Sequence, residues 1–372
     1  MTRVLVLNSG SSSLRYRLFD GSEVLAKGLI QRIGEAGGDA ADHGEALQRL
    51  MDTVDLTGLA AVGHRVVHGG DRFTASTVIT DEVAATIEEL IPLAPLHNPA
   101  ALTGIKVARK LLPDVPQVAV FDTAFHASIP PEGVFWAVDR DLAQRWGLRR
   151  YGFHGTSHAY VSRETARLLG KPPAETNVIT LHLGNGSSAT AVQGGRSVAT
   201  SMGMTPLSGL VMGTRSGDID PSLVFHLHRV AGLPLDEIED MLTRRSGLLG
   251  LTGDNDMRTV LERRAAGDAE AALAFDVYCR RLREYVGSYL AVLGRLDAIT
   301  FTAGVGENSP DVRSGALTGL EALGIAIDPE RNARNELIIS PDGSPITVCV
   351  VPTEEELEIA DEARRAVGSA ES

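Results

Sequence analysis

The 372-residue chain is poor in cysteine, aromatic residues and lysine, and it has no long hydrophobic run. Its two cysteines stand apart, with no Cys-x-x-Cys pair and no Cys/His cluster, so a disulfide framework is excluded and a reducing compartment is favoured. The first apolar run, residues 4–7, is too short for a signal peptide, and no stretch approaches the about 18 apolar residues of a membrane span. These absences predict a cytoplasmic protein with no membrane partner and with buried structural thiols.

Positive charge is also in deficit. Lys and Arg number 35 against 48 Asp and Glu, a net charge of −13, which argues against a general nucleic-acid or anionic-membrane binder. A local basic pocket for a small anion stays open. With 43% hydrophobic and 22% charged residues the chain is of globular type, and at about 150 residues per domain its length predicts two domains.

Short apolar runs alternate with helical patterns along the chain, which indicates an α/β fold. Strands are expected at residues 4–7, 14–19, 60–67, 116–121, 177–183, 299–302 and 346–351. Helices are expected at 81–91, with Thr80 as N-cap, and at 157–169, 268–293 and 353–367. The apolar stripe of the long helix at 268–293, which begins with Leu273 and Val277, indicates a core or subunit contact.

A short segment near the start of the chain is repeated near its middle. Residues 5–13 match residues 181–189 at five of nine positions, and both segments run from an apolar strand through a Gly/Ser turn into another strand. The repeat predicts two related halves, each opening with the same hairpin, and one ligand held in the cleft between them.

The Gly/Ser turns suit phosphate oxygens, because they expose several backbone N–H groups in a small space. Two better-known phosphate motifs are excluded. The only Gly-Lys, at Gly170, is followed by Lys171-Pro172, so there is no Walker A loop. Gly184-x-Gly186-x-x-Ala189 formally fits a dinucleotide fingerprint, but a strand follows it and no acidic residue comes before Asp218. A third Gly-rich turn, residues 302–309, follows a strand and precedes an expected helix.

Polar clusters stand at residues 63–70, 121–126, 151–158 and 212–221. Arg65 and Asp122 come at strand ends, where α/β folds usually place active-site groups. His154 and His158 have a zinc-like spacing, but Gly155 lies between them and the metalloprotease glutamate is absent. Each cluster alone has a structural alternative: a turn cap, an ion-pair partner or a buried hydrogen-bonding histidine.

In their order along the chain these segments resemble the acetate/propionate kinase family, within the actin-like ATPase and sugar-kinase superfamily. The matching segments are residues 6–14, 63–70, 94–99, 120–126, 151–158, 182–187, 201–221, 246–250, 301–308 and 351–357. The resemblance covers residues 4–360.

The resemblance implies a fold of two duplicated actin-like, ribonuclease H-like α/β domains with a cleft between them. The expected domains are residues 1–123 plus 354–372, and residues 124–353. It implies reversible, direct in-line transfer of the ATP γ-phosphoryl group to acetate, giving acetyl phosphate and ADP, with Mg²⁺, or Mn²⁺ in its place. A homodimer is also implied.

The family's site residues carry over by matching position. The expected catalytic residues are Asp122, His154 and Arg215. The expected substrate residues are Arg65, on the carboxylate, and the apolar Val67, Leu96, Phe153 and Pro206. The expected nucleotide contacts are Arg15, His182, Leu183, Gly184, Asn185, Gly186, Asp256, Met257, Arg258, Gly304, Val305, Gly306, Glu307 and Asn308. The expected metal residues are Asn8 and Glu355.

Elementary chemistry agrees with these roles. Acetate is ionised at pH 7 and needs no strong base, so the difficulty is to bring two anions together, which calls for cations. Asp122 is then expected to organise the site, with no phosphorylated intermediate. Glu355 has an alternative role, because a Glu in the first turn of any helix favours its dipole.

The chain departs from the family at two positions, where Arg15 replaces a usual Lys and Ala303 a usual Gly. The rival predictions are a propionate or other short-chain acyl kinase, and a non-catalytic nucleotide sensor or chaperone-like ATPase. The β-branched Val67 would crowd a longer substrate and favours acetate. The presence of the full set of transfer residues disfavours the sensor.

Overall fold

The computed structural model describes residues 2–370, which divide into two compact units. The first contains the described residues up to Ala127, Gly155–Ser157 and the residues from Glu354 onward. The second contains Ser128–His154 and His158–Thr353. The domain division expected at residues 123 and 354 stays a prediction.

The first unit is built on a six-stranded sheet in the order β3-β2-β1-β4-β6-β5. Its strands are β1 Arg3–Ser9, β2 Ser13–Asp20, β3 Glu23–Gln31, β4 Leu59–Val66, β5 Thr77–Val78 and β6 Gln117–Phe121. Its longer helices are α1 His43–Thr53, α2 Asp81–Glu89, α3 Asn98–Leu111 and α15 Glu355–Ala370, with a short η1 at Ile91–Leu93 and η2 beginning at Ala124 (Ala124–Ser128). The predicted N-cap of α2 is confirmed, because the Thr80 side chain accepts a hydrogen bond from the Val83 N–H.

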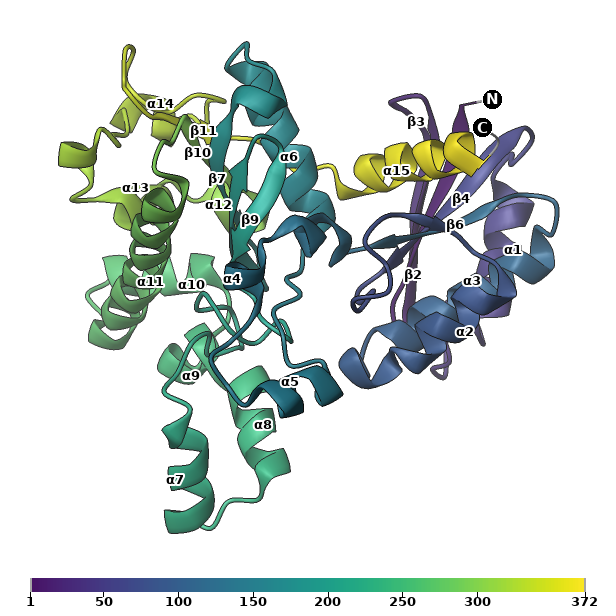
Figure 1. The fold of residues 1–372 in the computed structure, drawn as a ribbon, viewed down its shortest axis with the longest axis horizontal. Helices are drawn as coiled ribbons and strands as arrows, with labels where there is room; N and C mark the ends of the chain where they lie inside the picture. The colour runs from purple at the N-terminus through teal and green to yellow at the C-terminus, as the bar shows by residue number, and fades with distance from the viewer. Residues whose placement is uncertain (1, 371–372) are drawn as a thin grey trace. The chain divides into compact units, whose positions relative to one another are not determined.

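Strand β1 is buried on both faces, since successive side chains point to opposite sides of a sheet. Val4 and Val6 pack with Ile359 of α15, and Figure 1 shows α15 lying along this sheet. Leu5 and Leu7 pack on the opposite face with residues of α1 and α3. The sequence that forms the last helix of the chain therefore covers the first strand.

The second unit is built on a five-stranded sheet in the order β11-β10-β7-β8-β9. Its strands are β7 Asn177–Leu183, β8 Ser187–Gln193, β9 Arg196–Thr200, β10 Ala298–Thr302 and β11 Thr347–Val350. The helices that follow β6 along the chain are α4 Pro131–Val134, α5 Arg140–Trp146, α6 Gly155–Leu168, α7 Ser222–Val230, α8 Leu235–Arg244, α9 Gly247–Thr252, α10 Met257–Ala265, α11 Ala269–Leu293, α12 Ala303–Asn308, α13 Pro310–Leu317 and α14 Pro329–Ala333, with η3 Pro173–Glu175 and η4 Glu321–Leu323.

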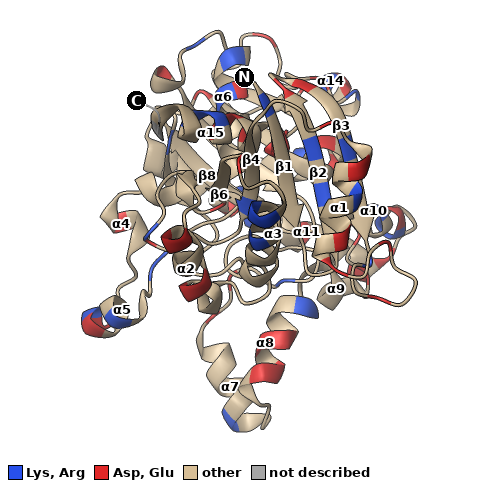
Figure 2. Cartoon of the chain, turned by 90° about the vertical axis from the view of Figure 1, so that its right-hand side faces the viewer, with Lys and Arg blue, Asp and Glu red and all other residues tan. Residues whose placement is uncertain are grey.

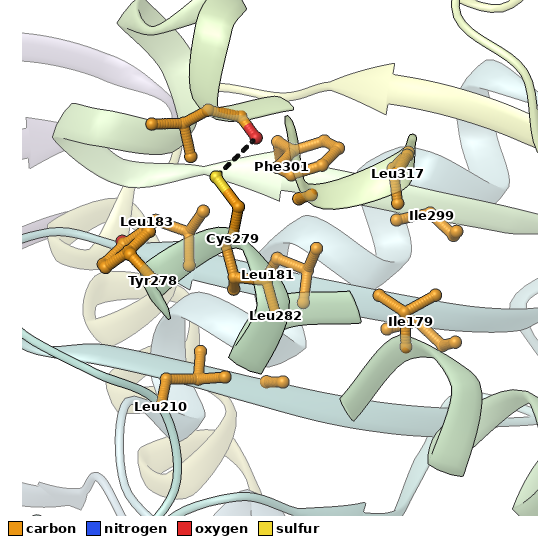
Figure 3. Close-up of a cluster of buried hydrophobic side chains, with 14 of the residues drawn as sticks. Ile179, Leu181, Leu183, Leu210, Tyr278, Cys279, Leu282, Ile299, Phe301 and Leu317 are labelled. Atoms are coloured by element: carbon orange, nitrogen blue, oxygen red, sulfur yellow. Dashed lines mark hydrogen bonds between the residues drawn. The ribbon is translucent and has the colours of Figure 1, made fainter. Parts of the chain in front are cut away.

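The long helix α11 packs apolar side chains against one face of this sheet. Leu282 and Tyr278 lie in one cluster with Leu181 of β7 and Phe301 of β10 (Figure 3). At the start of the predicted stripe Leu273 is 60% exposed and Val277 is 36% exposed, so these two residues are not core residues of the single chain. The alternative that they form a subunit contact stays a prediction.

The two sheets share one topology, and this confirms the duplication that the repeat predicted. In chain order, each unit starts with a hairpin, adds a third antiparallel strand, and then sets its fourth strand parallel to the first on the other side. The repeated segments 5–13 and 181–189 occupy the same place in the two hairpins, the turn between the first two strands. The predicted duplicated α/β fold class is confirmed.

Helix charges mostly follow the helix dipoles. Acidic residues lie in the first turns of α2 and α8 and basic residues in the last turn of α3, as Figure 2 shows. Among residues 2–370, no helix is long and apolar enough to cross a bilayer.

Both cysteines are buried, as predicted. The Cys279 thiol lies 3.9 Å from the Val312 carbonyl oxygen (Figure 3), and Cys349 is fully covered. Burial raises the pKa of each thiol to about 12. Neither thiol is therefore a nucleophile at neutral pH.

Candidate active site

In the first unit, Arg65 and Asp122 form a bidentate ion pair at the carboxyl ends of two neighbouring parallel strands. Arg65 lies near the end of β4, and Asp122 directly follows β6. Arg65 Nε donates to Asp122 Oδ1 at 3.0 Å, and Nη2 donates to Oδ2 at 2.8 Å. The Asp122 carboxylate first of all, and then Glu355, raise the pKa of Arg65 against the effect of burial. Two of the three guanidinium nitrogens are thus held by Asp122.

Glu355 is the first residue of α15, and its Oε2 lies 3.9 Å from Arg65 Nη2. Burial raises the pKa of Glu355; Arg65 acts against this, and Asp122 and Glu356 add to it. Within residues 2–370, the nearest cation to this half-buried carboxylate is Arg65, at a distance too long for a hydrogen bond. Such a group gains free energy by binding a cation.

Two arginines of β2 face the same helix start. Arg15 Nη1 lies 3.8 Å from Glu356, and Arg17 donates to Glu354 at 2.6 Å. The structure therefore gives Arg15, an expected nucleotide contact, an acidic neighbour, although its side chain is 57% exposed. Arg17 and Glu356 were not expected at the site.

Asn8 lies near the end of β1, directly across the hairpin from Arg15. An amide oxygen and a carboxylate are hard oxygen ligands, and Mg²⁺ typically takes only one or two carboxylates together with substrate phosphates. Among residues 2–370, no group of three or more His, Cys, Asp or Glu could hold a metal. Glu355 is half-buried, and its nearest cation, Arg65, lies 3.9 Å away, so its carboxylate is of a kind that could bind Mg²⁺; the metal role of Asn8 and Glu355 stays a prediction.

The expected apolar substrate residues of this unit are less well placed. Val67 directly follows β4 and is half-buried. Leu96 has 66% of its surface exposed. Its substrate role stays a prediction.

In the second unit, the expected phosphoryl-binding residues lie close together. His154 precedes α6 in the left-handed region, with φ +55°, and its ring stacks on His182 with centroids 4.2 Å apart. A Cβ built on Gly186 would lie 3.4 Å from Arg215 Nη1 and 3.6 Å from His154 Nε2. The absence of a side chain at Gly186 thus leaves its backbone beside both of these nitrogen groups.

Arg215 has no acidic partner among the residues described. Its Nη1 donates to the Pro206 carbonyl at 3.1 Å and lies 3.7 Å from the Met212 sulfur. Burial lowers the pKa of Arg215. A half-buried cation that no carboxylate neutralises is suited to receive an anion.

The other expected nucleotide contacts of the second unit differ in how far their side chains are exposed. Leu183 is fully buried, whereas Asn185 is exposed at the turn of the β7–β8 hairpin and its carbonyl accepts from the Gly213 N–H at 3.0 Å. Asp256 caps α10 and also binds the exposed Arg258 side chain. Met257 is 4% exposed and belongs to the core cluster of the second unit, and its role as a nucleotide contact stays a prediction.

The third Gly-rich turn is itself a helix, which corrects the expectation of a turn. Gly304, Val305, Gly306, Glu307 and Asn308 all belong to α12. The Glu307 carboxylate accepts from the Ala303 N–H at 2.8 Å and from the Thr353 N–H at 3.1 Å, and this closes the first turn. Ala303, the residue that departs from the family, takes a left-handed conformation with φ +64°.

Some residues near the site escaped the sequence analysis. Ser188 hydrogen-bonds both His154 and His158, and the fully buried Arg313 donates to the carbonyls of Gly306 and Glu307. Of the expected apolar substrate residues, Phe153 is 2% exposed, and the Pro206 carbonyl accepts a hydrogen bond from Arg215. Nothing in the local sequence signals a buried arginine at 313. The repeat did contain Ser188.

The chain is similar to known proteins in both sequence and structure. A model of the Acetokinase family matches residues 3–361. An acetate kinase of Streptomyces avermitilis is 56% identical, with 99% of this chain and 98% of that protein covered. The crystal structure of Porphyromonas gingivalis acetate kinase is similar with a TM-score of 0.94 at 40% identity, over 99% of this chain and 100% of that chain. A propionate kinase from Francisella tularensis is similar with a TM-score of 0.92 at 41% identity, over 98% and 100%.

Proposed function

Because the chain belongs to the acetokinase family, we propose that it transfers the γ-phosphoryl group of ATP to acetate, giving acetyl phosphate and ADP, and catalyses the reverse reaction. The observation that carries this proposal is the half-buried Arg215. It has no acidic partner among residues 2–370, and it lies beside His154 Nε2 at the glycine of a hairpin turn. Such a group is suited to the charge that develops on a transferring phosphoryl group.

Arg65 and Asp122 would receive the acceptor. The carboxylate of acetate is ionised at neutral pH and attacks without a base. Asp122 holds Nε and Nη2 of Arg65, so the remaining Nη1 edge is the one left to bind the substrate carboxylate. In this arrangement Asp122 orients a cation, and direct in-line transfer needs no phosphorylated aspartate.

Asn8 and Glu355 would hold Mg²⁺, or Mn²⁺ in its place. When bound, the ion neutralises charge on the phosphate oxygens. The raised pKa of Glu355 and its 3.9 Å separation from Arg65 support this role, because a bound cation would compensate for the lost solvation of the carboxylate. The alternative, that Glu355 only favours the dipole of α15, predicts no dependence of stability on Mg²⁺.

Acetate is the proposed acceptor, and propionate is the second candidate. Curated relatives at about 56% identity carry the name acetate kinase, whereas the propionate kinase is 41% identical. One methylene in an apolar pocket is worth about 1–3 kcal/mol, so overlapping activity on both acids is expected. The half-buried Val67 favours the smaller acid. The proposed nucleotide contacts, the cytoplasmic location and the homodimer all remain predictions.

The test is acyl phosphate formation from ATP and Mg²⁺, with the product trapped by hydroxylamine, across acetate, propionate and butyrate. We expect the highest kcat/KM for acetate. A preference for propionate would keep the mechanism and change the substrate. If folded protein binds ATP but forms no acyl phosphate with any acid, the kinase proposal is wrong and the nucleotide-sensor alternative gains support.

A further inference from the structure

A row of buried hydrogen bonds leads from the core of the second unit to His154. Thr180 Oγ1 donates to the Thr190 carbonyl at 3.4 Å, and the same hydroxyl lies 2.7 Å from His158 Nδ1. His158 Nε2 lies 2.7 Å from Ser188 Oγ, which lies 2.9 Å from His154 Nδ1. Thr180, His158 and Ser188 are each 0% exposed. Bulk water therefore does not reach the three linking groups.

One direction for the row is set if the Thr180 hydroxyl donates to the Thr190 carbonyl, which can only accept. If the Thr180 hydroxyl gives its proton to Thr190, it accepts from His158 Nδ1–H. A neutral His158 then presents the lone pair of Nε2, which accepts the Ser188 proton. The Ser188 oxygen in turn accepts from His154 Nδ1–H.

We propose that Ser188 and His158 are positioning residues that fix the proton of neutral His154 on Nδ1. The other ring nitrogen, Nε2, is the one on the side of Gly186 and Arg215. In the neutral ring Nε2 then carries a lone pair, which repels a phosphoryl oxygen. Only the imidazolium form donates a hydrogen bond there.

This inference rests on the proposed function, in which His154 meets the transferring group. The charged and titratable groups that face its ring within the second unit include His182 of β7, which stacks on it, His158 of α6, and Arg215. The positive charge of Arg215 disfavours protonation of His154, and an incoming phosphate favours it. Protonation of His154 is therefore coupled to the arrival of the nucleotide phosphates.

The first test is nuclear magnetic resonance of the full chain labelled with ¹⁵N-histidine, which distinguishes the two neutral tautomers by the shifts and couplings of the ring nitrogens. The His154 signals are assigned by comparison with His154→Gln. We expect the Nδ1–H tautomer in the wild type and a mixture, or the Nε2–H tautomer, in Ser188→Ala. An Nε2–H wild type, or an unchanged tautomer in Ser188→Ala, would overturn the inference.

The second test is the pH profile of kcat. In the wild type kcat falls about tenfold per pH unit above the titration of His154, because the donor is lost with the proton. In Ser188→Ala this alkaline limb flattens, since a neutral ring with Nε2–H still donates. Ser188→Thr keeps a hydroxyl and restores the wild-type profile.

The matched control is Ser162→Ala, which removes a buried hydroxyl of α6 that donates to the Ala159 carbonyl at 3.0 Å. It should keep the wild-type profile and tautomer. If Ser188→Ala lowers kcat equally at every pH, Ser188 is merely structural and the inference fails. If neither the wild type nor any variant makes acyl phosphate, the proposed function fails. The tautomer measurement alone still decides whether Ser188 and His158 fix the proton of His154 on Nδ1.

Discussion

Arg215→Ala is the substitution that separates a phosphoryl-binding arginine from a structural one. In the structure the guanidinium is half-buried, hydrogen-bonded to one carbonyl, and has no acidic partner among the described residues. Two unit charges about 4 Å apart interact by about 4 kcal/mol at an effective dielectric constant near 20. If that energy is gained mainly in the transition state, its loss lowers kcat by about 10³-fold.

The same geometry predicts the effect on stability. Removing a partly desolvated cation leaves no carboxylate unpaired, so the free energy of unfolding of Arg215→Ala should match that of the wild type within about 1 kcal/mol. The measurements are kcat, both KM values and urea denaturation of the same preparations. Arg215→Lys keeps the charge but not the planar fork, so an intermediate kcat is expected.

The control is Arg244→Ala, in which an exposed arginine of α8 loses a 3.6 Å contact with Asp240. It should change neither kcat nor stability measurably. A loss of kcat below tenfold in Arg215→Ala would refute the reasoning. So would a loss of stability large enough to account for the inactivity.

Three further predictions follow from other parts of the site. Arg65→Met leaves the Asp122 carboxylate, 1% exposed, without its bidentate partner, and should lower the free energy of unfolding in urea by about 3–5 kcal/mol; unchanged stability would contradict this. Ala303→Gly relieves about 1–2 kcal/mol of left-handed strain against about 0.5–1 kcal/mol of added chain entropy, so its thermal midpoint should rise slightly, not fall. The pKa of Glu355 is raised in the folded state, so the folded chain binds this proton more tightly than the unfolded chain does. The stability of the wild type relative to Glu355→Gln should therefore fall as the pH rises above 4.5. Adding Mg²⁺ should raise the thermal midpoint of the wild type only, and an equal rise in Glu355→Gln would exclude the metal role.

Local patterns were sufficient to predict much of the fold. The apolar runs of β1 and β7, each followed by a Gly/Ser turn, predicted two equivalent hairpins, and Thr80 predicted the start of α2. These features depend on neighbours in the sequence. The α12 segment was missed as a helix because its first turn is closed by the Glu307 carboxylate and begins with Ala303 at a positive φ, a contact and a conformation that propensity does not show.

The structure brings some of the expected site residues together, but the partners of each residue could not be predicted from the sequence. Strand ends indicated Arg65 and Asp122 as candidate active-site groups, but their bidentate pairing depends on the register of β4 against β6, strands that lie far apart in the sequence. Ser188 was visible only as a repeat residue. Its function as a hydrogen-bond link depends on which face of β8 meets α6, and this is decided by the tertiary packing.

The two buried thiols make this chain a convenient background for spectroscopy. Cys279 and Cys349 have pKa values raised to about 12 and are covered by the core, so thiol-reactive dyes and spin labels should leave the native chain unmodified. A cysteine introduced at exposed Glu89 of α2, in the first unit, and another at exposed Asp141 of α5, in the second, would then be the only labelled sites. The two labels would then report on one unit each in the otherwise wild-type chain.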